Sequence, residues 1–90
     1  MSIKEVIVHE NRYADSVSLM GIGDRVKKCA GVLLAEIQMG TPANLEVLRE
    51  LGFDVPDGVG ANDLTVVIEA DDADALTRAQ AEVMDRLTHR

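Results

Sequence analysis

One corner of the sequence combines residue types that can bind a small anion. The corner Gly40–Asn44 follows the apolar run 32–37 and precedes a short helical pattern. Thr41 is a good helix N-cap, and Pro42 suits the first helical position because its missing N–H is not needed there. Unpaired N–H groups at a helix start favour a bound anion or carboxylate. The corner is therefore a candidate binding site, although a plain structural cap explains the same pattern.

A turn-rich loop is expected to complete this site. Residues 57–63 are rich in Asp, Gly and Asn, and loops of this kind often carry function. The corner lacks the Gly-Lys-Ser/Thr ending of a Walker A loop and the glycines of a dinucleotide-binding loop. The expected ligand is a small anionic carboxylate, a ureido acid or a CoA-type molecule. The candidate ligand-binding residues are Met39, Gly40, Thr41, Asn44, Asn62 and Asp63.

The remaining reactive side chains do not form a catalytic or metal-binding set. His9 and His89 are the only imidazoles, and Cys29 is the only thiol. No Ser-His-Asp or Cys-His pair stands at a helpful position, and no second ligand lies at metal-binding spacing from His9. We therefore predict no catalytic residue, no metal ligand and no cofactor. Cys29 is expected to be a buried, inert thiol without a disulfide partner.

The acidic composition excludes one class of partner. The net charge of −7 repels phosphate backbones, and only Tyr13 and Phe53 could stack on bases, so nucleic-acid binding is not expected. No apolar run approaches the length of a membrane span, and the N-terminus lacks the apolar core of a signal peptide. These features predict a cytoplasmic chain with no membrane contact, forming a single small domain over residues 1–90.

Hydrophobic periodicity predicts six elements in the order strand, helix, strand, short helix, strand, helix. Gly21 and Gly23 fall inside the first helix, which close approach of another backbone or a bend would explain. The expected boundaries are strands over residues 3–9, 32–39 and 64–70, a first helix from a cap at Asp15 or Ser16 to Gly31, a short helix through Leu51, and a last helix from Asp71–Asp74 to Arg90.

The strand faces indicate the fold class. Strict alternation of strands and helices is typical of a three-layer α/β parallel sheet, which stays the alternative. Each strand, however, has one strongly apolar face and one mixed face. We therefore predict an α+β, two-layer, ferredoxin-like fold: a three-stranded mixed sheet with helices on one face and the third strand in the middle. The mixed face (Val6, Val8, Leu34, Val67) would be partly bare, either as a partner surface or as ordinary exposure of single valines.

Several sequence blocks resemble the N-terminal region of FdrA proteins. The blocks are Asp15–Met20, Met39–Asn44, Leu48–Phe53 and Asn62–Leu64. These proteins are described as acyl-CoA synthetase-like and similar to the α chain of succinyl-CoA synthetase, and some are linked to oxamate carbamoyltransferase activity. The segments that resemble CoA ligases are missing here. The resemblance therefore implies an accessory domain and not possession of the transfer reaction.

Two function hypotheses follow. The first is a non-catalytic accessory or assembly module that forms a homodimer or associates with a larger synthetase-like or carbamoyltransferase subunit. The second is a regulatory domain that binds a small anionic ligand at the Gly40–Asn44 corner. An enzyme acting alone has the least support, because the carboxylates fall mainly at helix caps and on polar faces.

Overall fold

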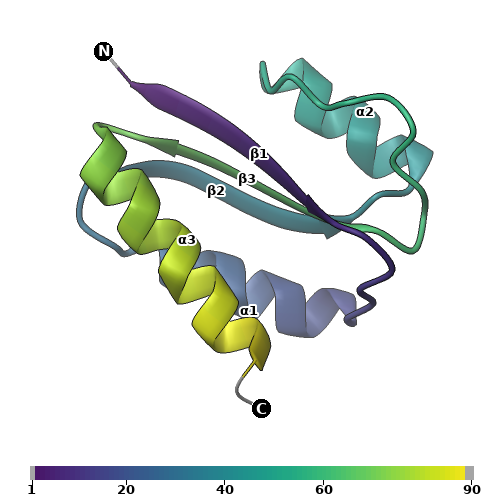
Figure 1. Cartoon of the computed structure of the whole chain (residues 1–90), viewed down its shortest axis with the longest axis horizontal. Helices are drawn as coiled ribbons and strands as arrows, with labels where there is room; N and C mark the ends of the chain where they lie inside the picture. The colour runs from purple at the N-terminus through teal and green to yellow at the C-terminus, as the bar shows by residue number, and fades with distance from the viewer. Residues whose placement is uncertain (1, 89–90) are drawn as a thin grey trace.

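The computed structural model describes residues 2–88 and contains the six expected elements in the expected order (Figure 1). His89 and Arg90, which the sequence pattern assigned to the end of the last helix, lie outside the described residues. The elements are β1 (Ile3–His9), α1 (Ser16–Lys27), β2 (Val32–Met39), α2 (Pro42–Glu50), β3 (Leu64–Ala70) and α3 (Ala73–Thr88).

Short polar side chains determine where the first two helices begin. The Asp15 carboxylate accepts a hydrogen bond from the Ser18 N–H at 3.0 Å, which starts α1. The Thr41 hydroxyl accepts from the Asn44 N–H at 3.3 Å, and Pro42 occupies the first turn of α2. Both caps satisfy N–H groups that have no partner within their own helix. The caps expected from the sequence are confirmed.

β3 is the central strand, and it pairs antiparallel with both neighbours. The sheet order is β1-β3-β2, with Val66 opposite Ile7 on one side and Ile37 on the other. β1 and β2 therefore run in the same direction, as in a split βαβ unit. The predicted α+β ferredoxin-like class and the middle position of the third strand are confirmed. The sheet is antiparallel throughout and not mixed, and the parallel α/β alternative is excluded.

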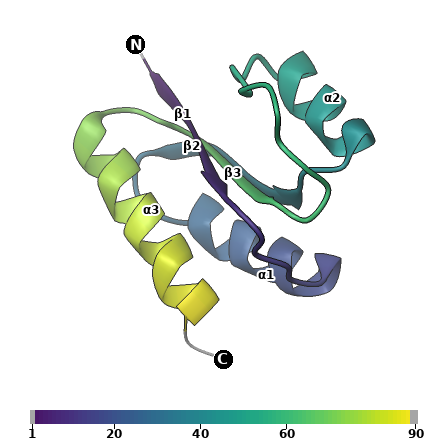
Figure 2. The ribbon, with the colours of Figure 1, turned by 45° about the vertical axis from the view of Figure 1, so that its right-hand side comes forward.

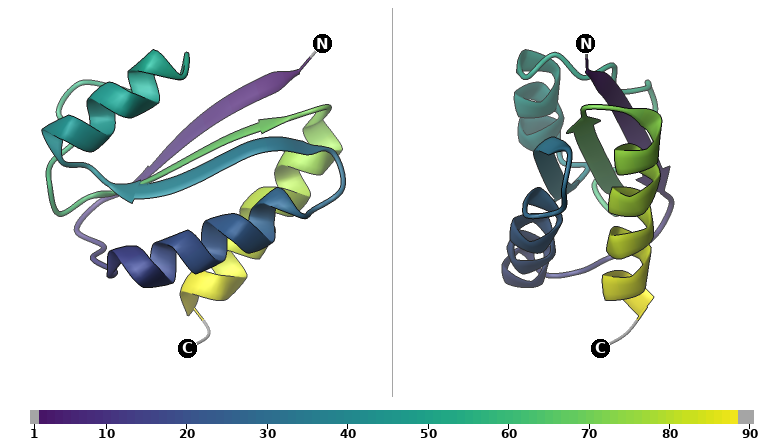
Figure 3. Two further views of the ribbon diagram at one scale, coloured as in Figure 1. Left: turned by 180° about the vertical axis from the view of Figure 1, so that it is seen from behind. Right: turned by 90° about the vertical axis from the view of Figure 1, so that its left-hand side faces the viewer.

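α1 and α3 cover one face of the sheet and form the larger core with it (Figure 3). Leu19 and Val26 of α1 meet Val66 and Ile68 of β3, while Val83 of α3 completes the cluster. All of these side chains are buried, so α1 and α3 each turn an apolar stripe toward the sheet. None of the helices within residues 2–88 combines the length and apolar character needed to cross a bilayer.

α2 and the segment after it lie against the opposite face of the sheet (Figure 2). The smaller core on this side consists of Leu45, Leu48, Phe53, Val55 and Val67, with Val6, Leu34 and Val59 packed against it. Phe53, just after α2, folds back into this core. The arrangement differs from the expectation in one detail, since one helix lies on the second face. α2 has only two core residues, and an apolar stripe this short does not indicate which face of the sheet the helix covers.

The surface expected to be partly bare is partly covered by α2 and the segment after it. Val67 is fully buried, and Val6, Val8 and Leu34 are half-buried. The cover comes from a short helix and an irregular segment, and their packing depends on tertiary contacts that periodicity does not report. Within residues 2–88, the mixed sheet face is closed around Val67 and partly open at the other three residues.

The two glycines of α1 differ in their surroundings. Gly23 is buried, and a Cβ added there would lie 3.9 Å from the Ala35 carbonyl oxygen. That distance is an ordinary contact, so close approach of α1 to β2, which the sequence suggested, does not require a glycine at position 23. A Cβ added at Gly21 meets no atom within 4 Å. No intramolecular contact explains a glycine at that position.

Replacing Gly21 by alanine is expected to raise the free energy of unfolding by about 0.5–1 kcal/mol, because alanine favours helix and loses less backbone entropy on folding. Urea unfolding followed by circular dichroism measures the change. Gly58→Ala is the matched control. It also has open space around it, but its φ of 86° disfavours any side chain, so that variant should lose stability. A loss at Gly21 would contradict the expectation.

Candidate functional site

The predicted binding corner forms, but its polar groups bind one another. The Gly40 N–H donates to the Asp63 carbonyl at 2.8 Å, which joins the corner to the loop before β3. The Asn44 side-chain amide donates to the Met39 carbonyl at 2.9 Å, and its backbone N–H donates to the Thr41 hydroxyl. The loop and the corner are adjacent, as expected. Their hydrogen bonds account for the polar residues there without a ligand.

The Asp63 carboxylate ties the loop to the connection after β1. One oxygen accepts from the Asn11 N–H at 2.9 Å and the other from the Gly60 N–H at 2.8 Å. These two donors hold the pKa of Asp63 below its usual value. Asn11 has a φ of 53°, a conformation that this bond helps to hold. Asn62, beside it, is exposed. The sequence did not reveal the bond because Asn11 and Asp63 are 52 residues apart.

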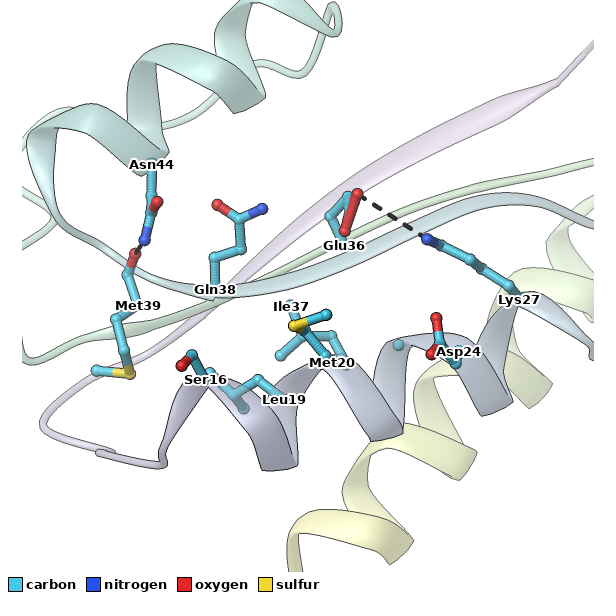
Figure 4. A pocket seen from close by; sticks show the side chains of 11 residues that line it. Ser16, Leu19, Met20, Asp24, Lys27, Glu36, Ile37, Gln38, Met39 and Asn44 are labelled. Atoms are coloured by element: carbon cyan, nitrogen blue, oxygen red, sulfur yellow. Dashed lines mark hydrogen bonds and ion pairs between the residues drawn. The ribbon is translucent and has the colours of Figure 1, made fainter.

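A groove of about 360 Å³ runs along the outer edge of β2, between α1 and the start of α2 (Figure 4). Met39 and Asn44 line this groove, whereas the other four predicted site residues do not. The groove is therefore centred on β2 and not on the predicted corner. It includes residues from both faces of β2, which means that it follows the strand edge.

The floor of this groove, the β2 groove, is apolar. Leu19 and Ile37 are buried side chains of the main core, and Met20 and Met39 lie beside them. Figure 4 shows Met20 of α1 and Ile37 of β2 in the same part of the groove. Methionine is unbranched and polarizable, so it adapts to differently shaped partners. A floor with two methionines is suited to an apolar ligand group whose shape is not fixed.

The rim of the β2 groove is polar. Lys27 Nζ lies 4.0 Å from Glu36 Oε1, and both side chains are partly exposed, so this ion pair is weak. The Gln38 carbonyl accepts from the Thr65 hydroxyl at 2.6 Å. Gln38 Oε1, in contrast, is buried and accepts no hydrogen bond from residues 2–88. An unmet buried acceptor is unfavourable, so a donor brought to this point would be bound.

A second groove, of about 390 Å³, separates α1 from the end of α3. Its floor contains Ala14, Ile22 and Leu87, and Arg25 and Arg86 stand at its rim. Arg86 Nε donates to Glu82 Oε1 at 2.9 Å, and together with Arg25 it gives the apolar floor a cationic rim that suits an anion with an apolar part. Sequence reasoning missed this groove because its two arginines belong to the first and last helices, whose mutual packing no local pattern encodes.

The fold and the grooves define a small ferredoxin-like α+β domain with a groove along an edge strand. Residues 1–90 match the family described as AllF, heavy metal-associated domain, and the chain belongs to this family. Uncharacterized protein YahF of Escherichia coli (strain K12) is 43% identical over 70 residues, which are 76% of this chain and 13% of YahF. The chain thus spans a small part of that relative's length. No solved structure gives a significant match.

These comparisons correct the resemblance inferred from the sequence blocks. The assignment to FdrA proteins is wrong, because the family that matches is the AllF domain and the relative found is YahF. The implied kinship with acyl-CoA synthetases and carbamoyltransferases is withdrawn with it. The blocks have structural explanations here, since Asp15 and Thr41 cap helices and Gly40 packs against the next loop.

The family description raises the question of a heavy metal. Residues 2–88 contain no group of three or more His, Cys, Asp or Glu side chains placed to share an ion. Cys29 was predicted to be buried, but the structure shows it half-buried. Its sulfur lies 3.9 Å from the Arg25 carbonyl oxygen. Soft metals are held by several thiolates or imidazoles. The described residues therefore do not fit a heavy-metal site.

His9 at the end of β1 is expected to make stability depend on pH. Its partial burial, and secondarily the nearby Arg12, lower its pKa from 6.5. Around that pH the unfolded chain binds more protons than the folded chain, so stability rises with pH. The free energy of unfolding should therefore be smaller at about pH 5 than at about pH 7.5, because the unfolded His9, with its ordinary pKa, takes up its proton between these two pH values. Urea titrations of His9→Gln should show a flatter profile, and an unchanged profile would contradict this reading.

Proposed function

We propose that this domain is a non-catalytic assembly module that docks onto another polypeptide, either a partner chain or a further part of a longer protein. The observation that carries the proposal is an exposed apolar set on α1. Val17 and Met20 are 76% and 68% exposed, and Tyr13, just before the helix, is 71% exposed. Residues three apart are neighbours on a helix surface. Val17 and Met20 are therefore neighbours, and this pair, called the α1 patch, has the character of a protein interaction surface.

The comparison with YahF supports the same proposal. The segment related to this chain is 13% of that protein, so a domain of this kind is there joined to a much longer polypeptide. A small domain within a long chain meets other surfaces at high effective concentration. We place the domain in the cytoplasm, because a single cysteine without a disulfide partner is typical of a reducing compartment.

Site-specific photo-crosslinking tests the proposal. A photoreactive amino acid at Val17 in the chain expressed in its own cells should give an adduct of one defined mass. The same probe at Val47 is the control, because Val47 is an exposed valine on α2, away from α1. Light scattering then tells a homodimer from a different partner. A strictly monomeric chain with no adduct at position 17, or equal adducts at both positions, would refute docking through α1.

A second candidate function is binding of a small anionic ligand. The observation in its favour is the groove with Arg25 and Arg86 at its rim. Thermal-shift screening against dicarboxylates, ureido acids, nucleotides and CoA should raise the melting temperature for one class. Arg25→Gln should abolish the shift, whereas Arg49→Gln on α2 should not. If Asn62→Ala abolishes it instead, the ligand binds at the Gly40–Asn44 corner. Absence of any shift would argue against both sites.

A further inference from the structure

We infer that the outer edge of β2 accepts an extended polypeptide segment as a fourth strand, and that this segment alternates apolar with cationic side chains. The inference rests on the proposed docking function and gives its partner a geometry and a chemistry. An edge strand presents unpaired N–H and C=O groups, which are a template for another strand. The sheet has two edge strands, β1 and β2, so the contacts of each must show which one can accept an added strand and which side chains that strand carries.

The charged side chains of β1 contact the layers on both faces of the sheet. Gln80 of α3 donates to the Glu5 carboxylate at 3.0 Å. On the other face, Lys4 Nζ lies 5.7 Å from the centre of the Phe53 ring. Charged side chains on an edge strand are a common protection against strand addition. We therefore favour β2 as the receiving edge, because a groove also runs along it.

The edge at β2 is open along the β2 groove. β3 occupies one side of β2, and no strand within residues 2–88 lies on the other side, which faces the viewer in the left panel of Figure 3. The pairing of β2 with β3 is irregular between Val32 and Leu34, so the regular stretch begins after it. An added strand would therefore align with residues 36–39, the stretch of β2 that lines the groove.

The two sides of β2 require different side chains from the added strand. Side chains alternate between faces along a strand, and residues opposite one another share a face. On the α1 side the segment would meet Ile37, Met39 and Met20, which bind apolar groups. On the α2 side it would meet Glu36 and Gln38, a carboxylate and an amide whose buried oxygen lacks a donor. Along the added strand, apolar residues should therefore alternate with residues that donate hydrogen bonds.

Charge decides that the donors are cationic. Asp24 and Glu36 line the groove with Lys27 as their counter-charge, so its charged rim is acidic on balance. The whole chain carries −7, which attracts cationic partners and repels anionic ones. An added lysine or arginine opposite Glu36 would gain an ion pair next to a strand edge. An acidic segment would be repelled at the same position.

The same charges disfavour a second copy of this chain as the occupant. Glu36 lies close to the midpoint of β2, which spans Val32–Met39. Antiparallel pairing of two β2 strands about that midpoint would bring two Glu36 carboxylates together, and like charges opposite one another are destabilising. Each copy would also bring its −7 charge. We therefore assign the edge to a different polypeptide segment.

Synthetic peptides test the inference on the intact chain. A short peptide in which lysine alternates with valine should bind, and hydrogen exchange should show new protection at β2 amides but not at β1 amides. N-methylation of alternate peptide nitrogens, which removes one edge of backbone donors, should weaken binding by about tenfold or more. Replacing the lysines by glutamates should weaken it by a similar factor. Equal binding of the N-methylated peptide would overturn strand addition.

Variants of the chain separate this inference from the proposed function. Glu36→Gln should weaken the lysine peptide severalfold and reduce the preference over the glutamate peptide. Met20→Ser should weaken both peptides, whereas Val47→Ser on α2 is the matched control and should change neither. Sedimentation that shows a dimer with β2 already protected would overturn the assigned partner. A cross-link at Val17 without peptide binding would leave docking intact and refute only strand addition.

Discussion

Replacing Leu48 by alanine is expected to lower the free energy of unfolding by about 2–5 kcal/mol. Leu48 is fully buried between α2 and the sheet, in the smaller core with Phe53 and Val67. Truncation removes buried methyl groups and leaves a cavity that a short helix can fill only in part. Since small domains are stable by only about 5–15 kcal/mol, the change is a large fraction of the total.

Urea unfolding followed by circular dichroism measures this loss, and Val47→Ala is its control. Val47 is the preceding residue on the same helix and is 46% exposed. Its truncation should change stability by no more than about 0.5 kcal/mol. Equal effects of the two substitutions would mean that α2 does not pack on the second face of the sheet.

The second large effect is expected at Gly40. A Cβ added there would lie 2.5 Å from the Gly60 carbonyl oxygen and equally close to Val59 Cγ1. The Gly60 oxygen belongs to the backbone, so the clash can be relieved only by separating the corner from the loop that its N–H binds. Gly40→Ala should therefore lower the free energy of unfolding by about 1–3 kcal/mol, the usual range for overpacking.

Gly60→Ala is the control for Gly40→Ala. A Cβ at Gly60 would come no nearer than 3.5 Å to the Asp63 carboxylate, which is an ordinary contact. That variant should unfold at nearly the wild-type urea concentration. The pair of variants also separates a structural role of the corner from a ligand-binding role. If Gly40 is needed for packing, its replacement lowers the free energy of unfolding even when no ligand is present. A Gly40→Ala variant of unchanged stability would restore the corner as a candidate ligand site.

The parts of the fold that could be predicted are those in which a local pattern repeats. Period-two alternation in residues 3–9, 32–39 and 64–70 predicted the three strands with the bounds that are observed. Thr41 gave a clear cap signal, and the first cap was narrowed to Asp15 or Ser16, of which Asp15 is the one observed. The ferredoxin-like order followed from topology, since a third strand between the first two completes the split βαβ unit.

The parts that could not be predicted depend on contacts between distant residues. The side of the sheet that α2 covers is decided by Leu48, Phe53 and Val67 packing together, and α2 is too short to show this. The corner and the loop were correctly placed next to one another, but the bond from the Asn11 N–H to the Asp63 carboxylate joins residues 52 positions apart. The β2 groove arises between two elements, so no single stretch of sequence carries its signal.

The place of β3 in the sheet has a consequence for biosynthesis. β3 is the last of the three strands to leave the ribosome, yet both others pair with it, and Ile3 lies opposite Ala70. A nascent chain that stops short of residue 64 therefore has two strands and no partner for either. Such long-range pairing slows folding. Until β3 emerges, the alternating apolar segments of β1 and β2 are open to chaperones and to aggregation.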